Sequence, residues 1–477
     1  MLFNSLAFAI FLPIVFILYW AFPHKYRWII LLVASYYFYM SWNVKYVVLI
    51  LLTTFVSYIC GILVEKTDKK SMKIFWMVSA LVVCLGVLFF FKYFNFISES
   101  VAAICNSIAI PMQPITLNLV LPVGISFYTF QSLSYVIDVY KKDVKAEKHF
   151  GKYALFVSFF PQLVAGPIER TSNLMPQLLE EQHFDLKEAS YGLRQMLLGF
   201  IKKLIIADSL SRYADIVFDN VHYYFGLTFI VAAILFTFQI YCDFSGYSDI
   251  AIGTSKLLGI KLMTNFSSPY YATSIKDFWG RWHISLSTWF RDYIYIPMGG
   301  NRCSKLKNAR NLMVTFLVSG LWHGANWTFV IWGGLHGLYQ VIGKFFTGKF
   351  NARFPKVVQT IVTFALVAFA WIFFRANSVE DAFYVVTHLH NGLIHFGNAF
   401  LKMMIDMGFN GFSFAKTVIA IVLLMVYDYF AQKQNVFAQM DKLKPVLRWI
   451  IYLVIVCFII VLKLHNGTNQ NFIYFQF

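Results

Sequence analysis

Charged residues are scarce in this chain. Of its 477 residues, only 13% are Asp, Glu, Lys or Arg, whereas 59% are hydrophobic and 19% are aromatic. A soluble globular chain carries about 25% charged residues. The deficit therefore excludes an ordinary soluble protein and indicates a polytopic membrane protein.

Cysteine is also rare, and its spacing excludes the common cysteine-based sites. The six cysteines stand singly, without a CxxC pair and without a histidine at metal-ligand spacing. We therefore expect no disulfide framework, no metal and no bound cofactor. The opening stretch lacks the basic start and the cleavage site of a signal peptide, so we expect residues 1–22 to stay as the first membrane helix.

Long stretches without charge fill most of the chain. About 20 apolar residues span a bilayer as a helix, so these stretches predict an all-α fold with roughly eleven transmembrane helices, together with re-entrant and interfacial helices. We expect one integral-membrane domain over residues 1–477. The charge-free windows are residues 1–22, 28–44, 46–64, 74–91, 100–137, 153–168, 221–242, 311–343 and 357–374, followed by less clean apolar stretches at 412–430 and 449–462.

The chain contains 40 Lys and Arg residues against 23 Asp and Glu residues. The positions of the basic residues favour a role in orienting the protein in the membrane over binding of nucleic acid. By the positive-inside rule, the five segments rich in bases face the cytoplasm, whereas residues 375–410 and the tail after residue 462 face outward. Between residues 152 and 261 the number of crossings stays open. The five basic segments are residues 65–73, 141–152, 261–310, 344–356 and 433–448.

Residues 311–343 contain two histidines and no charged residue. Because both flanks are assigned to the cytoplasm, we predict a hairpin that enters the membrane and returns, with arms that reach roughly 24 Å each. Gly324 and Asn326 suit the turn between the arms. His323 is then deep in the membrane, where ionisable groups usually mark sites or pathways. His336, near the returning end, can instead simply bond a neighbouring helix.

The most basic segment, residues 261–310, is predicted to be cytoplasmic and amphipathic. Within "SIKDFWGRWHISLSTWFRDYIYIPMGGNR", helical periodicity places Trp279 and Trp282 on one apolar arc, with Arg281 and Arg291 on the opposite side. His283 falls at the edge of the arc. The segment is either a simple anchor at the membrane surface or the entrance for an anionic donor, with these four Trp and Arg residues beside it.

The stretch "DFSGYSD" adds a polar cluster at the expected end of a membrane segment. Asp243 and Ser245 within it either shape the cytoplasmic mouth or cap a helix. The sequence leaves both possibilities open.

Several motifs together resemble the membrane-bound O-acyltransferase family, and most closely its bacterial alginate O-acetylase branch. They are "LPVGISFYTFQSLSYVIDVY", "FPQLVAGPIER", "QIYCDFSGYSDIAIG", "RWHISLS" and "FLVSGLWHGANWTFVIWGGLHG". The resemblance implies a helical fold around a membrane tunnel, with an acyl thioester entering from the cytoplasm and an acceptor approaching from the far side. It also implies that His323, in "WHGA", is catalytic and that His283, in "RWHISLS", is the second characteristic histidine.

The residue types fit this chemistry. A thioester such as acetyl-CoA is already activated, so the enzyme needs a base, a polarised carbonyl and a dry channel. A buried neutral histidine supplies the base. If the helix persists past His323, Asn326 either orients that histidine or donates to the oxyanion; otherwise it only forms the turn.

The expected function is acetyl transfer from acetyl-CoA across a bacterial plasma membrane toward hydroxyls of an extracytoplasmic polysaccharide, completed by a separate acyltransferase protein. Other acceptors stay open: peptidoglycan, cellulose or another exopolysaccharide, or D-alanyl transfer to teichoic acid. From a different class, a transporter or lipid flippase also has many helices and a buried histidine. Transporters, however, often carry repeated broken helices, and "WHGA" occurs once.

Overall fold

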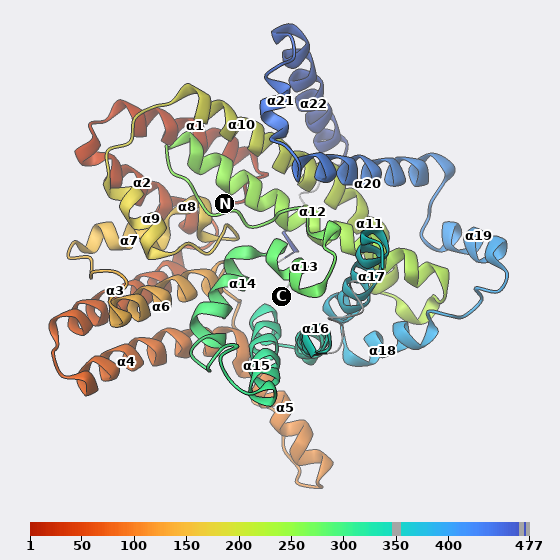
Figure 1. Cartoon of the computed structure of the whole chain (residues 1–477), viewed down its shortest axis with the longest axis horizontal. Coiled ribbons are helices and arrows are strands. Elements are labelled where there is room, and N and C mark those ends of the chain that lie inside the picture. Colours follow the sequence, from red (N-terminus) through yellow and green to blue (C-terminus); the bar gives the residue numbers. More distant parts are fainter. Residues whose placement is uncertain (346–353, 467–471, 474–477) are drawn as a thin grey trace. The chain divides into compact units, whose positions relative to one another are not determined.

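The structure is a computed structural model that describes residues 1–345, 354–466 and 472–473, and every regular element in these residues is a helix (Figure 1). The chain forms two compact units. The N-terminal unit comprises residues 1–196 and 248–263, and the C-terminal unit comprises residues 197–247 and 264–477. Two of the three boundaries fall inside the helices α10 (Leu186–Phe200) and α12 (Leu227–Leu257), and the third, between residues 263 and 264, lies in the loop after α12.

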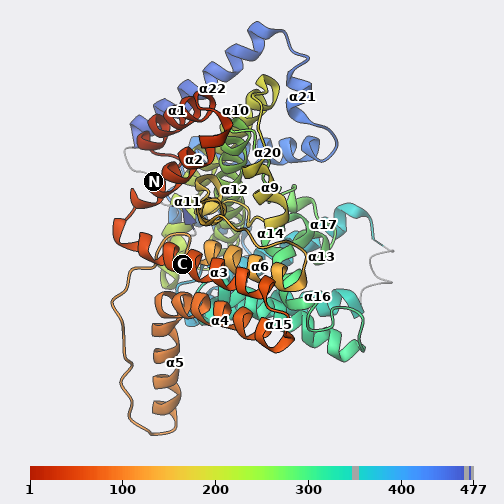
Figure 2. The ribbon, with the colours of Figure 1, turned by 90° about the vertical axis from the view of Figure 1, so that its left-hand side faces the viewer.

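The N-terminal unit is built on a layer of antiparallel apolar helices. In both views α3, α4 and α6 lie side by side (Figures 1 and 2). A π-helical turn, Phe89–Tyr93, joins α4 to α5 without a break. The helices of this unit are α1 (Leu6–Ala21), α2 (His24–Met40), α3 (Val47–Lys66), α4 (Lys70–Leu88), α5 (Phe94–Ser107), α6 (Ile125–Lys141), α7 (Phe150–Ser158), α8 (Phe160–Leu163) and α9 (Thr171–Leu179), with most of α10.

The C-terminal unit carries all the histidines singled out by the sequence. It begins with a π-helical segment, Ile201–Ala207, and α11 (Asp208–Phe218), followed by most of α12. Its remaining helices are α13 (Ile275–Arg281), α14 (Ile284–Phe290), α15 (Lys305–His323), α16 (Trp327–Phe345), α17 (Lys356–Arg375), α18 (Val379–His388), α19 (Phe396–Asp406), α20 (Gly411–Ala431), α21 (Val436–Met440) and α22 (Pro445–Asn466).

Six helical stretches in the described residues are long and apolar enough to cross a membrane, fewer than the roughly eleven that the windows predicted. The multi-pass helical fold is confirmed, but the number of crossings is not. The qualifying stretches are Val44–Lys66, Lys70–Ser107, Leu227–Leu257, Lys356–Arg375, Gly411–Ala431 and Pro445–Leu462.

Two of the predicted windows do not form single helices. Residues 100–137 contain Pro111, Pro114 and Pro122, which cannot donate to a helical ladder. The chain there leaves α5 at Ser107 and runs without regular structure to α6 (Figure 2). Residues 153–168 likewise form the two short helices α7 and α8 instead of one span.

Candidate active site

The tryptophan-rich segment is not the continuous amphipathic helix that its periodicity predicted. Helix α13 ends at Arg281, and α14 begins at Ile284. Between them His283 adopts φ 43° and ψ 53°, a left-handed conformation that is strained for a residue with a side chain. Such strain persists only where the surrounding structure imposes it, and it is concentrated at functional sites.

Asn265 imposes this turn. Its backbone oxygen accepts the N–H of Ile284 at 2.9 Å, and its side-chain Oδ1 accepts the N–H of Ser285 at 3.3 Å and the Ser285 hydroxyl at 3.0 Å. The same Oδ1 lies 3.1 Å from Nδ1 of His283. A loop residue 18 positions away therefore holds both the backbone and the ring of this histidine.

These contacts also assign the tautomer of His283. Because a backbone N–H can only donate, the Asn265 atom that it reaches is the amide oxygen, and Nδ1 of His283 donates its proton to the same oxygen. The lone pair of the neutral ring then lies on Nε2, which has no hydrogen-bond partner among the residues that the structure describes. Burial lowers the pKa of His283 to about 3, so the ring is neutral at physiological pH.

His283 is fully buried, not at the lipid–water boundary that its position on the predicted arc suggested. The apolar arc faces the interior of the C-terminal unit, since Trp279, Trp282 and Trp289 are all buried. The alternative of an aromatic belt at the membrane surface does not account for this burial.

His323 is the last residue of α15, and the chain turns directly after it. Gly324 is extended, and Asn326 accepts the N–H of Thr328 at 3.0 Å, which caps the start of α16. The amide of Asn326 also approaches the backbone oxygen of Asn377 at 3.4 Å. The helix does not persist to Asn326, so this residue does not have the helical i+3 position relative to His323. Its contacts fit the turn-forming role, and catalytic support of His323 stays a prediction.

Close packing of α15 against α16 fixes the place of His323. A Cβ on Gly320 would lie 2.2 Å from the carbonyl oxygen of Phe329, and one on Gly333 would lie 2.3 Å from that of Phe316. Only glycine permits the two backbones to approach this closely. The two helices accordingly run side by side in both views (Figures 1 and 2).

Aromatic rings surround His323 and bring it near His283. The ring centroids of Trp322, Trp332 and Phe374 lie 5.0, 5.0 and 5.5 Å from that of His323. The His283 ring is 6.5 Å away. The two histidines that the motifs singled out, 40 residues apart in sequence, thus share one buried aromatic cluster.

The polar residues of α12 are placed differently from their prediction. Asp243 and Ser245 lie in the interior of the 31-residue α12, so neither caps a helix. Both are buried. Asp243 pairs with Lys203 at 2.6 Å and accepts the backbone N–H of Ile473 at 2.9 Å. It anchors neighbouring segments of the C-terminal unit instead of marking the end of a span.

Lys203 and Asp208 complete this buried charge cluster, which sequence reasoning missed. Asp208 also pairs with Lys203, at 3.0 Å. Burial alone lowers the pKa of Lys203, but the carboxylates of Asp243 and Asp208 outweigh burial and raise it. Burial raises the pKa of Asp208 to about 6, against the opposing charge of Lys203. No local pattern signals the cluster, because its members come from different helices.

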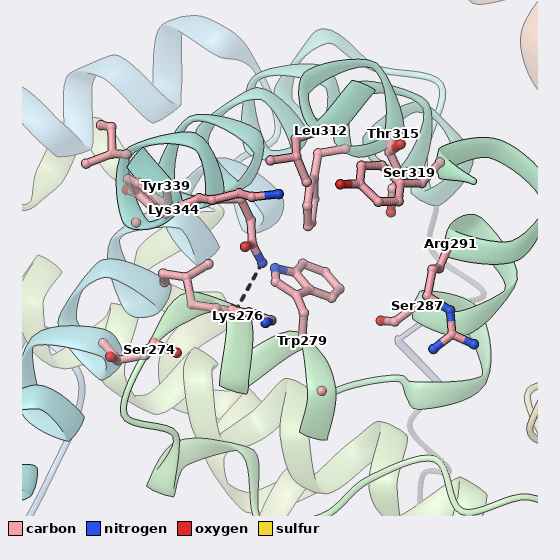
Figure 3. Close-up of a pocket in the computed structure, with 18 of the residues that line it drawn as sticks. Ser274, Lys276, Trp279, Ser287, Arg291, Leu312, Thr315, Ser319, Tyr339 and Lys344 are labelled. Carbon is pink, nitrogen blue, oxygen red and sulfur yellow. Dashed lines mark hydrogen bonds between the residues drawn. The ribbon is translucent and has the colours of Figure 1, made fainter. Parts of the chain in front are cut away.

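A cavity of about 1100 Å³ lies in the C-terminal unit, and its lining contains neighbours in sequence of His283 and His323 but not these two residues themselves. It is lined by residues of α13 to α17, and three cations stand on its walls: Lys276, Arg291 and Lys344 (Figure 3). Its lining includes Ile284, which directly follows His283, and Ser319, one helical turn before His323. An apolar pocket with a few polar groups is the usual form of a ligand site.

The two predicted entrance arginines differ in their placement. Arg291 lines the cavity and is 59% exposed, with an ion pair to the adjacent Asp292. Arg281 is not part of the lining; it pairs with Asp277 at 2.8 Å and donates to Gln432 at 2.9 Å. Trp279 is part of the cavity wall, whereas Trp282 is fully buried and is not part of the lining.

Comparisons with known proteins find similar sequences along most of the chain. The sequence profile of MBOAT, the membrane-bound O-acyltransferase family, matches residues 31–384. The chain is 38% identical to a probable alginate O-acetylase of Pseudomonas putida, over the whole length of both, and 38% identical to one of Azotobacter vinelandii, over 91% of this chain and 86% of that protein. It is 39% identical to a peptidoglycan O-acetyltransferase of Helicobacter pylori, over 75% of this chain and 72% of that protein.

Proposed function

Because this chain belongs to the membrane-bound O-acyltransferase family, we propose that it moves an acetyl group from cytoplasmic acetyl-CoA to hydroxyls of an extracytoplasmic polysaccharide. It is a multi-pass membrane O-acyltransferase, which removes the transporter and flippase alternatives. The bacterial plasma membrane is the proposed location, since the relatives compared above are bacterial.

The observation that carries the proposal is the pair of buried histidines beside the cavity. An acceptor hydroxyl that attacks the thioester carbonyl forms the ester bond as the carbon–sulfur bond breaks, and a neutral imidazole accepts the hydroxyl proton. The proton then passes to the CoA thiolate, so the reaction is balanced without another reactant. His323 and His283 are proposed as the catalytic residues, and the turn held by Asn265 supports Nε2 of His283 as a proton acceptor.

The cavity supports a donor with a phosphate-bearing handle. Lys276, Arg291 and Lys344 lie on its walls, and cationic side chains of this kind bind phosphates by charge-assisted hydrogen bonds (Figure 3). CoA combines such phosphates with a slender apolar arm that suits the space beside Trp279. A carrier protein with a phosphopantetheine arm would place fewer phosphates inside the cavity than CoA. Removal of one of these cations should therefore weaken the use of CoA more than the use of the carrier protein, which distinguishes the two donors.

The acceptor is proposed to be an exopolysaccharide of the alginate type, with peptidoglycan as the second candidate. The alginate relatives match the chain over more of its length than the peptidoglycan relative, although the identities are nearly equal. Transfer to the polymer is proposed to be completed by a separate extracytoplasmic acyltransferase. D-alanyl transfer to teichoic acid requires a different acyl group. It would be indicated in the test below by acyl transfer from a carrier protein and not from acetyl-CoA.

The test uses membranes of a strain that lacks its own copy and carries the wild-type chain or a variant at equal abundance. Wild-type membranes should release CoA from acetyl-CoA and acetylate the polymer, whereas His323→Ala should reduce both at least about 10²-fold, because one of the two proposed catalytic histidines is lost. Polymer acetylation at the wild-type rate by His323→Ala would contradict the proposed site. Acyl transfer only from a carrier protein would contradict the donor.

Arg291→Gln and Arg281→Gln form a matched pair of variants that tests whether the cavity binds the acetyl-CoA donor. Loss of one exposed contact to phosphate, worth about 1 kcal/mol, should raise the KM for acetyl-CoA about fivefold in Arg291→Gln with little change in kcat. Arg281→Gln, which does not line the cavity, should keep the wild-type KM. Equal effects in both variants would mean that the cavity is not the entrance.

A further inference from the structure

A third histidine, His336, lies against the cavity wall and has no role in the chemistry above. It follows His323 by 13 residues on α16 and is fully buried. Its Nδ1 is 3.2 Å from the indole nitrogen of Trp279 on α13. Because an indole N–H only donates, Nδ1 of His336 is the acceptor, and the ring proton resides on Nε2.

The surrounding rings leave His336 little freedom. Phe278 and Phe316 lie nearly parallel to it, with interplanar angles of 10° and 25°, and Trp332 meets it edge-on at 5.0 Å. Its Nε2 has no hydrogen-bond partner among the described residues. A buried donor left without a partner is destabilising, so the presence of a histidine here calls for a reason other than stability.

The bond from Trp279 suggests that reason. Trp279 is part of the cavity wall and contacts Phe316 at 5.3 Å and Trp332 at 5.8 Å. Trp332 in turn lies 5.0 Å from His323. The indole of Trp279, which stands in the cavity wall (Figure 3), is therefore connected through Trp332 to the aromatic cluster that contains His323.

We propose that His336 is a positioning residue that sets the acyl length: by accepting the Trp279 N–H, it holds the indole in place as part of the cavity wall. With the wall in this place, a two-carbon acyl group reaches the histidines and a longer chain meets the indole. This inference rests on the proposed function, because it concerns the donor of that reaction.

Without the acceptor on His336, the indole can leave its rotamer and open space beyond the wall. The increase in kcat/KM should be specific to donors with a longer acyl chain, because an acetyl group does not reach the space behind the indole ring. One or two methylene groups change the discrimination of an apolar pocket by about 10- to 200-fold. A residue that only stabilises the fold would instead change the rates with all donors equally.

The experiment compares kcat/KM for acetyl-CoA and butyryl-CoA in the membranes described above, with CoA release as the readout. His336→Phe keeps an aromatic ring but removes the acceptor, and Trp279→Phe removes the donor. Each should raise the butyryl-to-acetyl ratio about tenfold, and the double variant should go no further. His336→Gln, whose amide oxygen can accept the indole N–H, should keep the ratio within about threefold of wild type.

The outcomes separate the possible failures. His390→Phe, the same substitution at an exposed position, serves as the control and should leave the ratio unchanged. An unchanged ratio in His336→Phe, or an equal loss with both donors, overturns the inference and leaves the proposed function intact. If His336→Phe fails to accumulate, Trp279→Phe decides. If wild-type membranes release no CoA from either thioester, the proposed function fails and the inference fails with it.

Discussion

Replacing Asn265 tests whether the left-handed turn at His283 serves catalysis. Asn265→Leu keeps a side chain of similar size and removes the oxygen that accepts from Nδ1 of His283 and from both donors of Ser285. The backbone bond from Ile284 to Asn265 is retained in the variant. The ring of His283 then loses the contact that fixes its proton on Nδ1.

The magnitude follows from that contact. One neutral hydrogen bond contributes about 1 to 1.5 kcal/mol, which corresponds to a factor of about 5 to 12 in the fraction of His283 with its lone pair on Nε2. We therefore expect kcat to fall about tenfold. KM for acetyl-CoA should change little, because Asn265 is not part of the cavity lining.

Asn265→Asp tests whether Asn265 acts by orienting the ring of His283 or only by packing against it. Its carboxylate still accepts from Nδ1, so activity at pH 8 should stay near wild type. The added negative charge favours the imidazolium and raises the pKa of His283 from its low value in the wild type. Below the raised pKa the base is protonated, so the rate of the variant should fall on the acid side, where the wild-type rate does not depend on His283.

The assay is CoA release between pH 5.5 and 8, with size-exclusion chromatography in detergent to confirm folding. Asn435→Ala is the control, since it removes an asparagine cap from α21 without touching the site. A wild-type kcat in Asn265→Leu, or the same pH profile in Asn265→Asp and wild type, would refute the assignment of Nε2 as the base.

The family and the helical membrane character could be predicted from the sequence because both depend on local information. Hydrophobic composition indicates membrane helices whatever their packing, and short motifs such as "WHGA" carry the family resemblance without reference to the fold. The turn after His323 is equally local. A glycine and an asparagine follow the histidine directly, and the structure ends α15 and begins α16 around them.

The break at Trp282 and His283 could not be predicted in this way. Helices α13 and α14 both keep their aromatic residues toward the interior, so the apolar periodicity runs through the break as if the helix were continuous. The cause is Asn265, a loop residue whose partners lie about 20 positions downstream. Long-range hydrogen bonds of this kind override local propensity, and a single sequence carries no signal for them.

The remaining predictions concern stability and use thermal unfolding in detergent. Burial raises the pKa of Glu169 to about 7, above its usual 4.5, so stability falls as pH rises through this window, by up to about 1.4 kcal/mol per pH unit; Glu169→Gln should flatten the dependence, and an unchanged slope would contradict it. Lys203→Met should lower the free energy of unfolding by about 3 to 5 kcal/mol, because it leaves the buried carboxylate of Asp243 and the partly exposed carboxylate of Asp208 without their cation. Adding Asp243→Asn removes one of those charges, so the double variant should melt above Lys203→Met itself. A double variant whose loss equals the sum of the two single losses would show that the lysine acts through packing, and the buried charge cluster would then not account for the position of α12.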